Sequence, residues 1–89
     1  MFVVDTFYIV DPALAGPHKA AHKAFVEKYI GEGTFLYAGP KQDNSGGIIL
    51  MNGRDIEHVS AIMAEDSFIS EGIVGMKISE FDPLFSSHK

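Results

Sequence analysis

TFLYAGPKQDNSGGIILM, residues 34–51, contains two short apolar stretches separated by a turn. Aromatic and β-branched residues favour strands, so we expect strands at 34–38 and 48–51. Gly39-Pro40 ends the first of these strands, and the intervening run Asp43-Asn44-Ser45-Gly46-Gly47 consists entirely of turn-forming residues. The segment therefore predicts a β-hairpin near the middle of the chain.

A helix is predicted on each side of this hairpin. The first covers about 17–31, because Gly16-Pro17 supplies a proline at the first helical position, and glycines follow at its end. The second covers about 56–65, with Asp55 as its N-cap. Each helix thus joins one strand of the hairpin to a strand further out in the sequence.

The outermost strands are predicted at 2–10 and at about 73–81, where apolar and β-branched residues dominate. The order is then strand, helix, strand, strand, helix, strand. This order is typical of the α+β ferredoxin-like βαββαβ fold, a four-stranded antiparallel sheet with two helices on one face. Residues 1–89 are expected to form a single domain.

Composition limits the classes of function. Of the 89 residues, 46% are hydrophobic and 21% charged, as in globular proteins. A net charge of −5 disfavours nucleic acid and anionic lipid as partners. No apolar run is long enough to span a membrane, and the N-terminus lacks the positive region of a signal peptide, so we expect a cytoplasmic protein. With no cysteine, the chain must be stabilised by packing.

Both faces of the first predicted strand are apolar. One face carries Phe2, Val4, Tyr8 and Val10, and the other carries Val3, Phe7 and Ile9. Since two helices cover only one face of a sheet, the other would be left bare, and large bare apolar surfaces are rare on monomers. We therefore expect a homodimer that packs sheet against sheet. The alternative cover, the segment 82–89, is long enough only for the edge of that face.

His22 is the first candidate for chemistry. A helical wheel places it between Phe25 and Tyr29 on one side and Val26 and Ile30 on the other, so the imidazole faces inward. A buried histidine needs a polar partner. From the wheel alone, a core histidine bonded to a backbone carbonyl is a slightly better explanation than a catalytic one.

Asp66 is the second candidate. The inner face of the second helix is predicted to hold Ile56, Val59 and Met63, and the wheel brings Asp66 round toward the side of Val59. A carboxylate between apolar neighbours must be paired, and His22 lies on the same side of the sheet. The alternative is an ordinary helix-terminal or turn residue before Ser67.

Other chemical motifs are scarce. The sequence has no Gly-rich phosphate loop, serine elbow or metalloprotease signature, and we expect no cofactor. His18 and His22 have the i, i+4 spacing of metal ligands, but such pairs are common by chance and no third ligand is evident, so no metal is expected. A small organic molecule is the remaining class of ligand.

Three stretches together resemble the YCII-related (YciI-like) family of the dimeric α/β-barrel superfamily. The first runs from His22 through Gly33 to Phe35-Leu36-Tyr37-Ala38-Gly39-Pro40; the second is Gly46-Gly47-Ile48-Ile49; the third is Ala64-Glu65-Asp66-Ser67-Phe68, followed by Gly72. The resemblance covers nearly the whole chain. Two positions depart from the family pattern: Ser67 replaces a proline, and Lys19 stands where many relatives have arginine.

The resemblance implies a ferredoxin-like dimer with His22 and Asp66 as its acid–base pair. It implies lyase, dehydrohalogenase or isomerase chemistry on a small organic substrate, with His22 as general base or acid. The residues expected to contact that substrate are Lys19, Tyr37, Gly39, Pro40, Ser67 and Phe68. A module that binds a small metabolite without converting it is the alternative. A cofactor-free monooxygenase would share the fold, but no residue argues for oxygen chemistry.

Overall fold

The computed structural model describes residues 1–87. It contains the predicted strand–helix order with two short helices added. In chain order the elements are β1 (Phe2–Tyr8), the 3₁₀ helix η1 (Pro12–His18), α1 (Lys19–Gly31), β2 (Phe35–Pro40), β3 (Gly47–Met51), α2 (Ile56–Met63), α3 (Ser67–Ser70) and β4 (Val74–Glu80). The α+β ferredoxin-like fold is confirmed.

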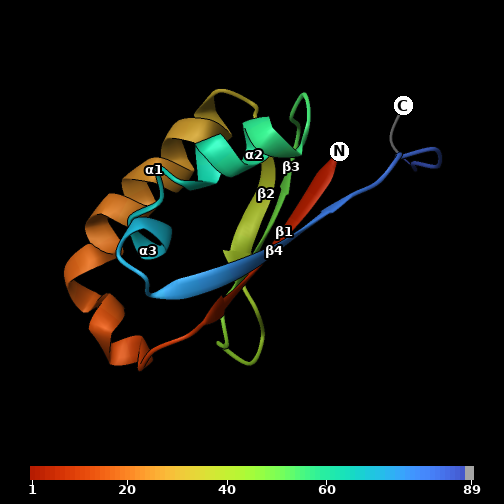
Figure 1. Ribbon diagram of the computed structural model, residues 1–89. Helices are drawn as coiled ribbons and strands as arrows, with labels where there is room; N and C mark the ends of the chain where they lie inside the picture. Colours follow the sequence, from red (N-terminus) through yellow and green to blue (C-terminus); the bar gives the residue numbers. More distant parts are fainter. Residues whose placement is uncertain (88–89) are drawn as a thin grey trace.

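The four strands form one antiparallel sheet in the order β2-β3-β1-β4. The helices lie on one face of this sheet, as Figure 1 shows, and the opposite face is left open. β1 occupies the middle and pairs with β3 on one side and with β4 along its whole length on the other. Side chains of β1 therefore meet the other elements at the centre of the molecule.

The core lies between the sheet and the helices. Phe2 and Val4 of β1 are fully buried, as are Met51 of β3 and Val59 and Met63 of α2. Aromatic rings join α1 to β2, since Phe25 and Phe35 meet edge to face with centroids 5.5 Å apart. Each fully buried side chain of this size contributes about 1.5–3 kcal/mol from removal of apolar surface from water.

Helix boundaries differ from prediction in two places. Pro17 lies in η1, whose Asp11 accepts a hydrogen bond from the Ala13 backbone at 2.9 Å, and α1 begins two residues later. The helix expected over 56–65 ends at Met63, and Asp66 begins the separate helix α3. Asp55 caps α2 as predicted, accepting from the His58 backbone at 2.8 Å.

Ile56 was expected on the inner face of α2, and this prediction is wrong. Its side chain is 50% exposed. Ile56 is the first residue of the helix, next to the capping Asp55, and the buried positions of α2 are Val59, Ile62 and Met63. The inward-facing stripe thus begins one turn later than the wheel indicated.

The open face of the sheet is apolar with a charged centre. Among its residues, Phe7, Tyr37 and Ile48 are exposed. Asp5 also lies on this face and forms an ion pair with Lys41, their charged atoms 2.6 Å apart. The open face is therefore less uniformly apolar than the sequence of β1 alone indicated.

Candidate active site

His22 and Asp66 meet as the helical wheels predicted. Nδ1 of His22 lies 2.8 Å from Oδ1 of Asp66, across 44 residues of sequence. The histidine side chain is 32% exposed and the carboxylate is buried. An ionised carboxylate only accepts hydrogen bonds, so Nδ1 carries the proton and donates it to Asp66.

Asp66 is held by the start of α3. It is the N-cap of this helix, and its Oδ1 accepts a second hydrogen bond from the Phe68 backbone N–H at 3.0 Å. Burying a carboxylate is costly unless hydrogen bonds replace its water. The two donors, imidazole and backbone amide, supply that replacement.

Glu65, which precedes Asp66, makes a second connection between this segment and α1. The Tyr29 hydroxyl donates to the Glu65 carboxylate at 2.8 Å, and Lys28 Nζ lies 3.6 Å from the same group. Burial raises the pKa of the Tyr29 phenol, and the adjacent Glu65 carboxylate raises it further. Residues 65 and 66 are thus anchored to the same helix at points about two turns apart, which positions Asp66 against His22.

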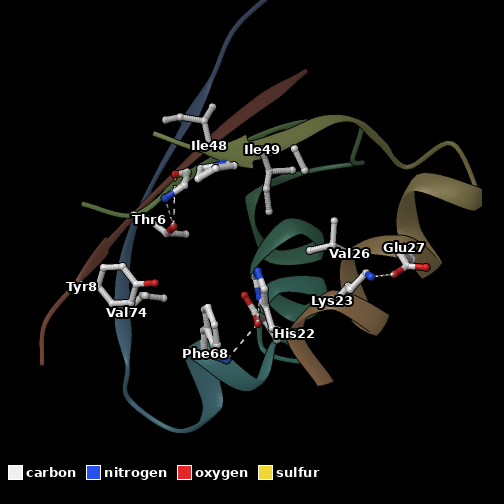
Figure 2. A pocket seen from close by; sticks show the side chains of 16 residues that line it. Thr6, Tyr8, His22, Lys23, Val26, Glu27, Ile48, Ile49, Phe68 and Val74 are labelled. Atoms are coloured by element: carbon white, nitrogen blue, oxygen red, sulfur yellow. Dashed lines mark hydrogen bonds and ion pairs between the residues drawn. The ribbon is translucent and has the colours of Figure 1, made fainter. Parts of the chain in front are cut away.

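A pocket of about 280 Å³ opens beside this pair, between the helices and the sheet. Figure 2 shows that its labelled residues come from strands on one side and helices on the other. The wall is mostly apolar, with His22 and Asp66 among its few polar groups. The lining residues are Thr6, Tyr8, His22, Lys23, Val26, Glu27, Ala38, Gly39, Pro40, Gly46, Gly47, Ile48, Ile49, Asp66, Phe68 and Val74.

Of the six residues expected to contact substrate, Gly39, Pro40 and Phe68 line the pocket. The other three do not. Lys19 is exposed at the start of α1, and the Ser67 hydroxyl donates to the His18 carbonyl at 3.0 Å. Tyr37 is 67% exposed and pairs with Leu50 of β3, which places it on the open face.

Thr6 and Tyr8 also line the pocket, although neither was expected there from the sequence. Both follow Phe2 and Val4 at a spacing of two, so all four share the face of β1 that is turned toward the helices. Along this face of β1 the residues change from apolar (Phe2, Val4) to hydroxyl-bearing (Thr6, Tyr8), and this change is visible in the sequence. It marks the point along β1 where the hydrophobic core ends and the pocket begins.

Residues 1–87 contain neither a membrane-spanning helix nor a cluster of metal ligands. No helix in this part of the chain is long and apolar enough to cross a membrane. Nor do three or more His, Cys, Asp or Glu side chains gather there in a group able to hold a metal ion. The site consists of the histidine–aspartate pair and the pocket beside it.

Fold and site together define a ferredoxin-like α+β protein with a histidine–carboxylate pair at an apolar pocket. The sequence profile of the YCII-related domain matches residues 3–82. The chain therefore belongs to the YCII-related family.

Among solved structures, the chain is similar to 5-chloro-2-hydroxyhydroquinone dehydrochlorinase (TftG) from Burkholderia phenoliruptrix, in complex with 2,5-dihydroxybenzoquinone. The match covers 92% of this chain and 94% of that one, with a TM-score of 0.71 and 17% identity. At this identity the likeness is one of fold. No functionally curated protein matches the chain significantly.

Proposed function

We propose that this chain is a small-molecule enzyme of the lyase, dehydrohalogenase or isomerase type, with His22 as its general base and acid. The observation that carries the proposal is the 2.8 Å contact between His22 Nδ1 and the buried Asp66 carboxylate, at the wall of a pocket. A carboxylate that accepts from one ring nitrogen fixes the tautomer and stabilises the imidazolium that forms after proton transfer. Nε2 is then the nitrogen that exchanges a proton with a bound molecule.

The pocket indicates the size and character of the substrate. Its volume of about 280 Å³ suits a compound of one ring, and its apolar wall suits an aromatic or quinonoid body. The solved structure of the similar dehydrochlorinase is a complex with such a ring compound, 2,5-dihydroxybenzoquinone. We therefore favour a one-ring substrate that bears hydroxyl groups and a leaving group.

For such a substrate the reaction balances without an added oxidant or reductant. Nε2 of His22 removes a hydroxyl proton, the electron pair of that O–H bond forms a carbonyl, and the imidazolium returns the proton to the ring carbon that bears the halogen, which becomes tetrahedral. Nε2 then removes a proton from a second hydroxyl, whose O–H electron pair forms the other carbonyl of the quinone, and halide leaves the tetrahedral carbon with the electron pair of the carbon–halogen bond. The net change is loss of HX, and the imidazolium returns its proton to solvent before the next cycle.

A panel of one-ring halogenated hydroquinols tests the proposal. We expect at least one compound to release halide, together with the change in absorbance that accompanies quinone formation. A hydroquinol of the same ring without halogen is the matched control and should release nothing. If compounds bind, as shown by calorimetry, but are recovered unchanged across halogenated and isomerisable rings, the chain is a metabolite-binding module instead.

We also propose that the chain works as a homodimer through the open face of its sheet. The exposed Phe7, Tyr37 and Ile48 support this proposal, since a second copy would remove them from water. Asp5 and Lys41 lie on the same face and, as a neutral pair, can be covered at lower cost than a single charge.

Tyr37→Arg tests the dimer, because Tyr37 is 67% exposed and the substitution should leave the fold intact. We expect light scattering to give twice the chain mass of 9.7 kDa for the wild type. For the variant, the measured mass should fall toward that of a single chain. Lys23→Arg, on the helical side, is the control and should remain dimeric. A wild-type protein that is monomeric at micromolar concentration contradicts the proposal.

A further inference from the structure

We infer that Phe68 is a positioning residue for His22: its ring fixes the plane of the imidazole while Asp66 fixes the position of Nδ1. The two rings are parallel to within 2°, with centroids 4.0 Å apart. Figure 2 shows them next to each other, one from α1 and the other from α3. This inference deepens the proposed function, on which it rests, by giving Phe68 a role other than contact with substrate.

The hydrogen bond to Asp66 alone does not orient the ring. It holds one atom, Nδ1, and leaves the imidazole free to tilt about the line that joins the two residues. A flat hydrocarbon surface against one face of the imidazole removes that freedom. Reacting groups must be held within a few tenths of an ångström and about 10–20° of the productive geometry, so this restraint bears directly on proton transfer.

Phe68 is rigid enough to serve as that surface. It is buried in a small cluster with Ala15, Ile73 and Val74, which belong to η1 and to the region where β4 begins. The Phe68 carbonyl also accepts from the Ile73 backbone at 2.9 Å. The Phe68 ring is thus held by this apolar cluster, and one of its faces lies against the His22 imidazole.

One short segment therefore restrains His22 in two ways. The Phe68 backbone N–H donates to the same Asp66 oxygen that accepts from the His22 imidazole. The Phe68 side-chain ring stacks on that imidazole. Ser67, between Asp66 and Phe68, donates to the carbonyl of His18, the N-cap of α1, and so ties the segment to the start of that helix. The consecutive residues Asp66, Ser67 and Phe68 thus supply, in that order, a hydrogen-bond acceptor for His22, an anchor to α1 and a stacking surface.

Phe68→Leu, with Phe68→Met as a second ring-free variant, tests the inference without any substrate. With ¹³C-labelled histidine, the NMR signals of His22 in the wild type should show the ring-current shift of a stacked imidazole and relaxation typical of a rigid side chain. Both ring-free variants should lose the shift and gain mobility, and Phe68→Tyr should retain both features. Phe25→Leu is the matched control, because Phe25 is buried against Tyr29 and Phe35 and does not line the pocket.

Kinetics then separate positioning from substrate contact. For a positioning residue, Phe68→Leu lowers kcat about 10-fold with little change in KM, and Phe68→Tyr restores it. A raised KM with unchanged kcat would make Phe68 a substrate contact and overturn the inference, as would imidazole relaxation identical to that of the wild type. If the wild type converts no compound, the proposed function fails, while the NMR result still decides the role of Phe68.

Discussion

His22→Asn lowers turnover of a confirmed substrate by about 10²–10⁴-fold, the usual contribution of a positioned general base. Asparagine is the informative replacement. Its side-chain amide can donate to Asp66 in place of Nδ1, which keeps the buried carboxylate paired, and it has no group equivalent to Nε2. The loss should therefore appear in kcat, measured under saturating substrate, while the fold and the affinity for a product analogue are retained.

His22→Ala should show a similar loss of turnover with a larger loss of stability, because it leaves the buried Asp66 carboxylate short of a hydrogen-bond donor.

His18→Asn is the matched control for this prediction. His18 precedes His22 by one helical turn and does not line the pocket, so its replacement should leave kcat within about twofold of the wild type. His18→Asn also tests whether His18 and His22 together bind a metal. If they did, removing either histidine would weaken metal binding, and His18→Asn would lower kcat as much as His22→Asn does. Turnover unchanged in His22→Asn would remove the histidine from the mechanism.

The order of elements could be predicted because each boundary has a local cause. The run of turn residues before Gly47 marks the hairpin, and Asp55 caps α2 through its own side chain. The inward direction of His22 followed from apolar residues at helical spacing. All of these signals lie within a few residues of the feature they predict.

The position of Tyr37 could not be predicted in this way. The family resemblance suggested Tyr37 as a substrate contact, and strict alternation along a strand would put it on the same face as Phe35. A β-bulge between the two residues breaks the alternation, so Phe35 enters the core while Tyr37 faces the open side. The bulge depends on how β2 pairs with β3, and nothing in the sequence of β2 marks it.

The surroundings of Asp66 were likewise beyond local reasoning. The wheel treated residues 56–65 as one helix, with Asp66 just beyond its end, whereas the chain breaks after Met63 and restarts with Asp66 as the cap of α3. The restart brings Phe68 onto the imidazole, a contact between residues 46 positions apart in sequence. Long-range packing of this kind fixes the site: the sequence indicated His22, Asp66 and some of the lining residues, but not the stacking of Phe68 on His22.

Gly46 should be the position most sensitive to a single added methyl group. It ends the turn between β2 and β3, where the neighbouring Gly47 exchanges hydrogen bonds with Thr6 Oγ1: its amide donates at 2.9 Å and its carbonyl accepts at 3.3 Å. A Cβ on Gly46 would lie 1.9 Å from the Thr6 carbonyl oxygen and 2.8 Å from the Phe7 Cα. These are backbone atoms of the central strand, which cannot rotate away as a flexible side chain would.

Gly46→Ala is therefore expected to destabilise the protein by about 3 kcal/mol, at the upper end of typical overpacking costs. In a domain of this size such a loss lowers Tm by roughly 12–24 °C, which differential scanning calorimetry measures directly. Gly39→Ala is the control, since Gly39 also lines the pocket but a Cβ there meets no atom within 4 Å. Equal Tm values for the two variants would show that β1 and the turn can separate at little cost. That outcome would also contradict a rigid pocket wall at Thr6, because Gly46 and Thr6 are in contact and both line the pocket.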